Sequence, residues 1–366
     1  MVRVPLTQPR RRLASLDAFR GLTIAAMIVV NNPGDWAAVY APLRHAQWNG
    51  CTPTDLVFPF FVFIAGAALA FAIVSARERG MADARFLGKC WTRALILIGI
   101  GVLLNGYPDF DLGRWRIPGV LQRIGLVFGL AATLAVFLRT RGRLVAAITL
   151  LVAYALLMAM GGDLSPAGNF GARIDRAVFG THLWRQTWDP EGLLGTLPAT
   201  STALIGVLTG TWLLRAGDRD GGARNLVVAG VALLMAGLAW HAFFPINKSL
   251  WSPAFVLFTA GAALELFAVG YWLIDVRGVR TWARPLIAIG MNSILLYTGS
   301  ELLAATLWQV VAVGDPPISA SAWLYLNAFL PWAGALNGSL AYALANLLFW
   351  YLVAAALHRR RIDLSI

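Results

Sequence analysis

Hydrophobic residues in this chain fall into long runs separated by short polar segments. A helix needs roughly 20 apolar residues to cross a hydrocarbon core of about 30 Å, and helices satisfy their own backbone polar groups in lipid. The runs predict ten transmembrane helices, at residues 16–33, 55–76, 91–105, 117–138, 144–161, 191–214, 225–243, 252–274, 285–312 and 338–357. The weaker run 321–336 is rich in aromatic residues and is broken by Pro331. It predicts an interfacial or re-entrant segment, with an eleventh span as the alternative.

The composition changes this picture only by excluding a soluble protein. Of 366 residues, 58% are hydrophobic and 13% are charged, and the mean hydropathy is +0.67; soluble domains are far more polar. We therefore expect an all-α polytopic protein with one transmembrane domain, residues 16–357, between a basic N-terminal segment (1–15) and a basic tail (358–366). Motifs typical of metal, nucleotide-hydrolysing and dinucleotide sites are absent from the sequence, so we predict no metal.

The net charge of +12 predicts orientation in the lipid bilayer and does not indicate nucleic-acid binding. Basic residues cluster in alternate connecting segments and form no continuous basic face. Because cytoplasmic loops carry the excess of Lys and Arg, both termini are predicted to be cytoplasmic. Cys51 and Cys90 fall at opposite ends of the second run, so we expect them on opposite sides of the bilayer with no disulfide between them.

Charged residues inside the predicted spans point to function, because an intramembrane charge costs a few kcal/mol and is usually kept for a partner or a cavity. Arg20 and Arg123 are in this position, and Arg93, at the start of the run 91–105, is counted with the cytoplasmic segment before it. Arg20 and Asn31 share one helical face and are separated by roughly 16 Å along the axis. Arg20 has two interpretations: an ion pair with Asp17 that anchors the helix end, or a guanidinium that binds phosphate at a cytoplasmic entrance.

The segment HAQWNGCTPTDLVFP places His45, Trp48, Asn49 and Asp55 directly before a predicted span. A lone histidine in a loop is usually solvated, but this one has an indole, an amide and a carboxylate close by in sequence. Asp55 is either a capping residue at a helix N-terminus, with Thr52, or a polar partner of His45.

Two further outer segments carry polar signals. Asp189 and Pro190, in the sequence DPEG, predict a helix start with Asp at the N-cap and Pro at the first helical position. Asn247 and Lys248 lie in a very short loop, where the cation would meet either a lipid headgroup or a substrate.

Six ordered blocks of sequence closely resemble the heparan-α-glucosaminide N-acetyltransferase family of membrane acetyltransferases. The blocks are residues 15–34, 45–66, 116–126, 188–199, 244–257 and 290–297. The resemblance implies transfer of an acetyl group from cytoplasmic acetyl-CoA to the amine of a terminal glucosamine across the membrane. In this resemblance His45 matches the essential histidine, Asn31 its companion asparagine, and Asp55 the aspartate of the DLVFP block.

The resemblance also sets expectations about setting and substrate. Lysosomal members carry an additional N-terminal region and span without a counterpart in this sequence, so we expect free glucosamine or a small amino sugar as acceptor, in the periplasm of a bacterium. The protein would be multi-pass in the inner membrane, with the lipid bilayer and acetyl-CoA as partners, no nucleic acid, and a homodimer suggested by resemblance.

Residues and resemblance together predict one site. Histidine, whose ordinary pKa is about 6.5, would serve as base or as acetyl carrier at position 45. Asp55 would orient it, and Asn31 or Asn49 would stabilise the oxyanion. The predicted cofactor-binding residues are Arg20, Arg93, Gln122, Arg123 and Asn292, with Arg284 as a further phosphate ligand. The predicted substrate-binding residues are Trp48, Asn49, Glu191, Asn247 and Lys248. The alternatives are a membrane O-acetyltransferase of a cell-surface polysaccharide and an amino-sugar transporter.

Overall fold

The computed structural model describes residues 13–216, 219–360 and 362, and these residues are mostly helical. The longer helices are α1 (Ala14–Asn31), α2 (Pro53–Glu78), α3 (Asp83–Gly106), α4 (Val120–Phe137), α5 (Thr140–Met160), α7 (Thr196–Arg215), α8 (Arg219–His241), α9 (Pro253–Tyr271), α11 (Ser293–Ala305) and α13 (Leu330–Arg359). Shorter elements are η1 (Ala41–Leu43), α6 (Phe170–Phe179), η2 (Trp272–Val276), α10 (Arg284–Met291), η3 (Thr306–Val310), α12 (Ala320–Leu324) and η4 (Tyr325–Phe329). Strands β1 (Ala312–Val313) and β2 (Ile318–Ser319) pair antiparallel.

The predicted all-α polytopic architecture is confirmed. Within the described residues, nine helices are long and apolar enough to cross a membrane, and there are ten if α10 and α11 with η3 form one bent span. The bend of 80° interrupts the predicted span 285–312 at Asn292, whose backbone is not helical. The predicted interfacial segment 321–336 comprises α12, η4 and the first turn of α13, and the non-helical Gly334 (φ 73°) separates it from the rest of α13.

Helix α2 is the central, most buried span, and it packs against α1, α4, α7 and α9. Its contact with α7 is close because a Cβ atom on Gly66 would overlap the backbone of Ala203, and one on Gly206 would overlap the backbone of Phe63. Small residues that bring helix backbones together are typical of association in membranes. This packing fixes α2, which carries Asp55 near its first turn.

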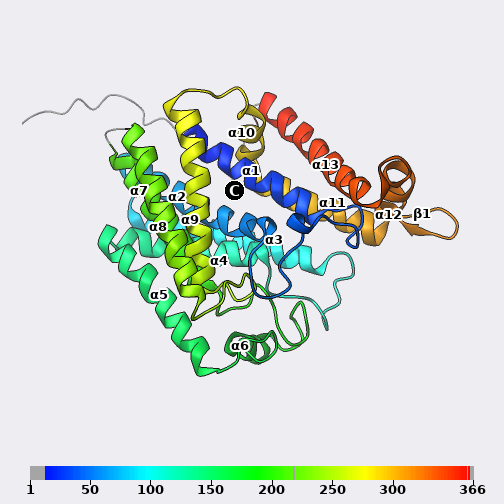
Figure 1. Ribbon diagram of the computed structural model, residues 1–366, viewed down its shortest axis with the longest axis horizontal. Helices are drawn as coiled ribbons and strands as arrows, with labels where there is room; N and C mark the ends of the chain where they lie inside the picture. Colours follow the sequence, from blue (N-terminus) through cyan, green and yellow to red (C-terminus); the bar gives the residue numbers. More distant parts are fainter. Residues whose placement is uncertain (1–12, 217–218, 361, 363–366) are drawn as a thin grey trace, which may run out of the picture.

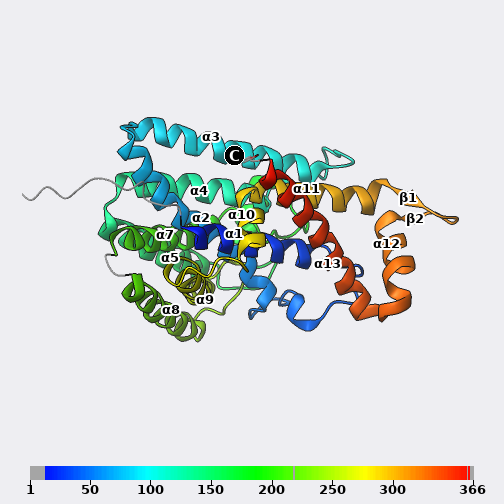
Figure 2. The same cartoon turned by 90° about the horizontal axis from the view of Figure 1, so that it is seen from above.

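The antiparallel order of the helices separates two kinds of connection. Residues 32–52, 107–119, 161–195 and 242–252 form the long-loop end, while the turns 79–82, 138–139 and 277–283 form the arginine-rich end. Figure 1 shows α6 among the long connections at the lower end of the bundle. In Figure 2, α12 and the β1–β2 pair extend to one side, away from α5, α7 and α8.

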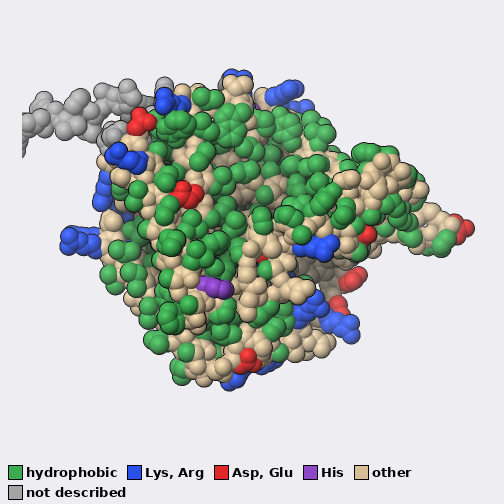
Figure 3. Space-filling view, viewed as in Figure 1, with side chains coloured by type: hydrophobic (Ala, Val, Ile, Leu, Met, Phe, Trp, Pro, Cys, Tyr) green, Lys and Arg blue, Asp and Glu red, His purple; other side chains and the backbone are tan. Residues whose placement is uncertain are grey.

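Hydrophobic side chains cover much of the face seen in Figure 3, with Lys and Arg mainly at its margins, a distribution suited to a surface in contact with lipid. Most of the two predicted terminal segments, 1–15 and 358–366, lies outside the described residues. The orientation predicted from charge stays a prediction.

Candidate active site

His45 and Asp55 form the centre of the site at the long-loop end. His45 Nδ1 lies 2.7 Å from Asp55 Oδ1, and the Asp55 side chain is buried while that of His45 is 47% exposed. Because an ionised carboxylate can only accept hydrogen bonds, Nδ1 carries the proton and donates it to Asp55. The arrangement leaves Nε2 as the ring nitrogen with a lone pair for chemistry.

The second oxygen of Asp55 holds the surrounding backbone. Asp55 Oδ2 accepts hydrogen bonds from the backbone N–H groups of Ala46 and Thr52, each at 3.0 Å. Together with the Thr52 side chain, the latter contact forms a capping box at the start of α2. Both sequence interpretations of Asp55 therefore hold at once: it caps α2 and it orients His45.

A second loop is fastened to the His45 loop and brings Lys248 to it. Gly50 N–H donates to the Ile246 carbonyl at 2.8 Å, and Asn247 Nδ2 donates to Asn49 Oδ1 at 3.1 Å. Gly50 has φ 106°, a conformation that favours glycine. The fully buried Asn247 also accepts from the Leu250 N–H group. Asn49 and Asn247 thus join the two loops.

Lys248 stacks over the imidazole of His45. Its Nζ lies 3.0 Å from Nδ1 and 3.4 Å from Nε2, and 3.6 Å from Asp55 Oδ1. An Nζ atom in the ring plane beside Nδ1 would lie much farther from Nε2, so these near-equal distances place it over the ring face. Asp55 therefore occupies the in-plane position at Nδ1, and the in-plane position at Nε2 is open to a reactant. Burial lowers the pKa of Lys248, and the charges of Asp55 and Glu191 offset only part of that effect.

Asn31, at the end of α1, contacts a different carboxylate. Its Nδ2 donates to Glu301 Oε1 at 2.9 Å, across from α11. This contact fixes the orientation of the amide. Tyr297, one turn earlier on α11, lies within electrostatic range of both Glu301 and Glu191. Glu191 therefore lies within electrostatic range of both Tyr297 and Lys248.

The DPEG segment does not start a helix, so the predicted N-cap role of Asp189 is wrong. Helix α7 begins at Thr196, and Asp189 instead receives two hydrogen bonds from Arg116, at 2.8 and 2.7 Å. Arg116 also donates to Glu191 at 2.5 Å. Burial by itself would lower the pKa of Arg116, but the bond to Asp189 and the charge of Glu191 outweigh it and raise that pKa. A bidentate ion pair ties two long loops together here.

Trp48 lines the floor of the same end. Its indole Nε1 donates to the Leu164 carbonyl at 3.0 Å, and its ring packs edge-to-face against Trp188 at 5.2 Å between centroids. Both tryptophans line a small crevice with Asp175 and Arg123. The predicted acceptor-binding residues thus all lie in the connected loops of the long-loop end.

A cavity opens in the bundle on the other side of the membrane core. Its volume, counted together with the space at its open mouth, is about 830 Å³. Helices α1, α2, α3, α4 and α11 line it. Its polar lining comes mainly from Arg20, Lys89 and Arg93, and its inner walls are apolar, with Phe61 and Leu97 among them. Along α2 the lining runs from Ala72 to Phe61, a rise of about 16 Å.

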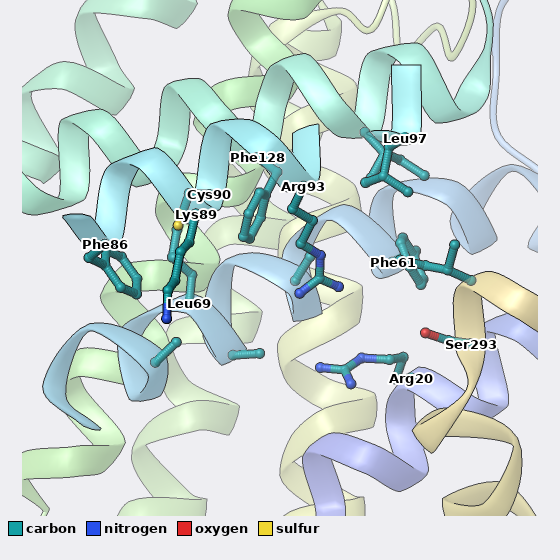
Figure 4. Close-up of a pocket in the computed structure, with 15 residues that line it drawn as sticks. Arg20, Phe61, Leu69, Phe86, Lys89, Cys90, Arg93, Leu97, Phe128 and Ser293 are labelled. Atoms are coloured by element: carbon teal, nitrogen blue, oxygen red, sulfur yellow. The ribbon is translucent and has the colours of Figure 1, made fainter. Parts of the chain in front are cut away.

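Figure 4 shows how the cationic groups enter this cavity. The side chains of Arg20 and Arg93 reach into it from α1 and α3, and Ser293 lies on α11 beside Arg20. Arg20 also lies 3.7 Å from Asp17. It therefore forms the predicted ion pair and lines the cavity at the same time. A second cavity shares Arg20 and opens toward Glu78 at the end of α2.

The other predicted cofactor residues do not line this cavity. Gln122 donates to the Ile117 carbonyl, and Asn292 donates to the Ile362 carbonyl at the bend between α10 and α11. Arg123 is fully buried, donates to the Pro190 and Gly192 carbonyls, and lies over the Trp251 ring. Arg123 therefore stabilises the 189–195 loop through these hydrogen bonds. Arg284 does not line the cavity either.

These features define a polytopic membrane protein with a histidine and carboxylate site at one end and a cationic cavity at the other. Residues 12–243 match the family described as heparan-alpha-glucosaminide N-acetyltransferase, catalytic, and the chain belongs to this family. Two curated relatives named heparan-alpha-glucosaminide N-acetyltransferase, from Mus musculus and Homo sapiens, are 32% and 33% identical to it. The alignments cover 80% of this chain but 54% and 53% of the relatives, so the chain spans about half their length.

Several groups of the site were not expected from sequence. They are Arg116 as the partner of Asp189, Asn31 as the particular partner of Glu301, and Lys89 in the cavity. The first two depend on contacts between distant segments. Lys89 carried a signal in the sequence, because it and Lys248 are the only lysines in the chain.

Proposed function

We propose that this protein is an acetyl-CoA-dependent N-acetyltransferase that acetylates the amine of glucosamine or a related small amino sugar across a membrane. The observation that carries the proposal is the arrangement along α2, with His45 held by Asp55 near its first turn and a cationic cavity along its later turns. The names of the family and of the relatives support the reaction class.

The cavity suits the donor. The guanidinium groups of Arg20 and Arg93 would bind the phosphates of acetyl-CoA, since the planar fork of arginine matches phosphate geometry, and Lys89 adds a third cation. The apolar walls would hold the pantetheine arm. The lining ends at Phe61, about 9 Å of helix rise before Asp55, so the acetyl thioester would extend beyond Phe61 toward His45.

The long-loop end suits the acceptor. An amine attacks a thioester only when it is unprotonated, so a base must take its proton. With Nδ1–H donated to Asp55, His45 Nε2 acts either as that base in a direct transfer or as a nucleophile that carries the acetyl group first. Asn31, oriented by Glu301, would donate its other amide hydrogen to the developing oxyanion. Asp55 and Glu191 supply the negative charge that attracts an ammonium group.

An acceptor panel tests the proposal and its alternatives. Purified protein is incubated with labelled acetyl-CoA and saturating glucosamine, glucose or N-acetylglucosamine. We expect glucosamine to be acetylated much faster than either neutral sugar, and its rate to rise with pH as the acceptor amine loses its proton. Equal or faster acetylation of a hydroxyl would favour the polysaccharide O-acetyltransferase, and transport without acetyl-CoA consumption would favour the transporter.

The direction of transfer follows from the predicted orientation, with the arginine-rich end in the cytoplasm. Cys51 is a poor reporter, because burial and the nearby Asp55 raise the pKa of its thiol to about 12. We therefore place single cysteines at the exposed positions Ala82 and Ala167 in a background without Cys51 and Cys90. A membrane-impermeant thiol reagent applied to spheroplasts should label Ala167→Cys and spare Ala82→Cys. The reverse pattern would overturn the direction of transfer.

The homodimer and the bacterial inner membrane stay expectations from the family resemblance. Cross-linking of the protein in membranes, followed by a mass measurement, tests the first. Fractionation of the producing cells tests the second.

A further inference from the structure

The chain uses lysine very sparingly. Of its 30 basic residues only two, Lys89 and Lys248, are lysines. Each lies at one end of the proposed site: Lys89 lines the cavity, and Lys248 lies over His45. Arginine stays charged in proteins, whereas lysine can lose its proton and then presents a nucleophilic amine. A role that needed only positive charge at position 248 could be filled by arginine, which this chain uses almost everywhere else.

We propose that Lys248 is itself an acetyl acceptor, so that the protein acetylates the ε-amine of this residue when no sugar occupies the site. The inference rests on the proposed acetyltransferase function. Its geometric basis is the position of Nζ, which lies 3.0 and 3.4 Å from the two ring nitrogens of His45 and over the face of the ring.

Nζ lies on a side of the ring plane from which an acyl group at His45 can be attacked. An acetyl group bonded to Nε2 is conjugated with the imidazole and lies in the ring plane, so a nucleophile must approach its carbonyl carbon from above or below that plane. Nζ is already on one of these faces. Because Nζ is nearer Nδ1 than Nε2, a rotation of the Lys248 side chain toward Nε2 brings it over the acetyl carbon, and holding the nucleophile this close removes much of the entropic barrier to reaction. In a direct transfer, the same amine would meet the thioester carbonyl positioned beside His45.

The environment of Lys248 favours a reactive amine. Its side chain is 22% exposed, and burial lowers its pKa, with Asp55 and Glu191 opposing this only in part. Desolvation is a recognised way in which proteins activate a lysine as a nucleophile. Cys51, the other nucleophilic side chain nearby, is held as a thiol by its raised pKa.

The step balances without any further reactant. The Nζ lone pair forms a bond to the acetyl carbonyl carbon, and the bond from that carbon to the CoA sulfur breaks, or the bond to Nε2 in the carrier route. The proton released by Nζ passes through His45 to the CoA thiolate. The products are an acetylated Lys248 and free CoA.

Acetylation at this position would stop sugar transfer. The modified side chain is neutral and bulkier, so it no longer pairs with Asp55 and it fills the space over His45. An amino sugar would protect the protein, because its own amine would take the acetyl group first. Incubation with acetyl-CoA and no acceptor should therefore cause a progressive loss of transferase activity, and glucosamine should prevent it.

The test uses the purified full-length protein in detergent with acetyl-CoA and no sugar, followed by peptide mass spectrometry of both lysines. We expect acetylation of Lys248 at least about ten-fold faster than that of Lys89, which lies in the donor cavity and reports non-specific chemistry. Saturating glucosamine and the His45→Ala substitution should each slow it about ten-fold or more. His45→Gln, with CoA binding as a check of folding, provides a second variant, and Lys248→Arg confirms the modified residue.

The outcomes separate this inference from the proposed function. Unmodified Lys248 in a protein that acetylates glucosamine overturns the self-acetylation and leaves the proposed function standing. Equal modification of Lys89 and Lys248, independent of His45, shows adventitious chemistry and also overturns it. No acetyl transfer to Lys248 or to any sugar would remove both proposals.

Discussion

The two ends of the proposed site differ in how their charges are balanced. At the long-loop end the charges are paired with one another, with His45 and Lys248 against Asp55 and with Arg116 against Asp189. In the cavity at the arginine-rich end, neither Lys89 nor Arg93 makes an ion pair with any residue that the structure describes, and the Arg93 guanidinium lies over the Phe128 ring at 5.2 Å.

This contrast indicates different roles for the two ends. Paired and hydrogen-bonded charges hold one another in place, so the long-loop end is organised before a substrate binds. Cations in a largely apolar cavity need a counter-charge, which a bound polyphosphate would supply. Substitutions at the long-loop end should therefore change turnover, and substitutions in the cavity should change the affinity for the donor.

The largest expected effect is that of His45→Ala. Loss of the base or acetyl carrier should reduce kcat for glucosamine acetylation by about 10³-fold or more. Without the imidazole, neither general-base nor nucleophilic catalysis is possible at this position. Binding of CoA, measured by calorimetry on the same preparation, should stay within about two-fold of the wild type, since the phosphates bind at the other end. Retention of substantial turnover would contradict the assignment of His45.

Asp55→Asn should have the next largest effect. The amide still offers an oxygen to His45 Nδ1–H, but it lacks the charge that stabilises a protonated imidazole, and its N–H groups clash with the Ala46 and Thr52 N–H donors. We expect kcat to fall about 10- to 1000-fold. Because Asp55 also caps α2, thermal unfolding must be measured in parallel. A fall in stability with unchanged kcat would reduce Asp55 to a purely structural residue.

A smaller effect is expected in the cavity. Arg93→Gln removes a cation that has no carboxylate partner among the described residues, so KM for acetyl-CoA should rise about ten-fold while kcat at saturation changes little. Arg284→Gln is the matched control, since Arg284 lies at the same end but does not line the cavity. Equal effects of the two substitutions would indicate a general loss of positive charge and would contradict a specific phosphate site.

The sequence predicted the architecture better than the contacts between loops. Apolar runs define spans directly, so the helical membrane fold followed from hydropathy. It did not reveal the bend at Asn292, because an apolar run carries no information about a change of direction. The pairing of His45 with Asp55 joins residues only ten apart, whereas Lys248 reaches His45 over 203 positions. The prediction for Asp189 was wrong because a DPEG sequence is compatible with both a helix start and a turn. The sequence did not indicate its partner Arg116, which lies 73 residues away.

The smallest predicted effect concerns Asp175, on α6 at the long-loop end. It tests whether every charge at this end is balanced by a neighbouring opposite charge. Burial raises the pKa of this carboxyl to about 6, although the Leu193 N–H group donates to it at 2.7 Å and Arg123 attracts it. The folded state thus favours the protonated form. The resulting stability is fully present below the unfolded pKa of about 4 and is lost as the pH rises through about 6.

The wild type should therefore be less stable at pH 7.5 than at pH 5, by about 1.4 kcal/mol from this group. Asp175→Asn keeps an oxygen that accepts from Leu193 N–H and never ionises, so its stability should depend less on pH and should exceed that of the wild type at pH 7.5. Thermal unfolding of both proteins in detergent at the two pH values measures this. A variant that is less stable than the wild type at pH 7.5 would show that the Asp175 charge is balanced after all, by Arg123 in particular, and that the long-loop end holds only compensated charges.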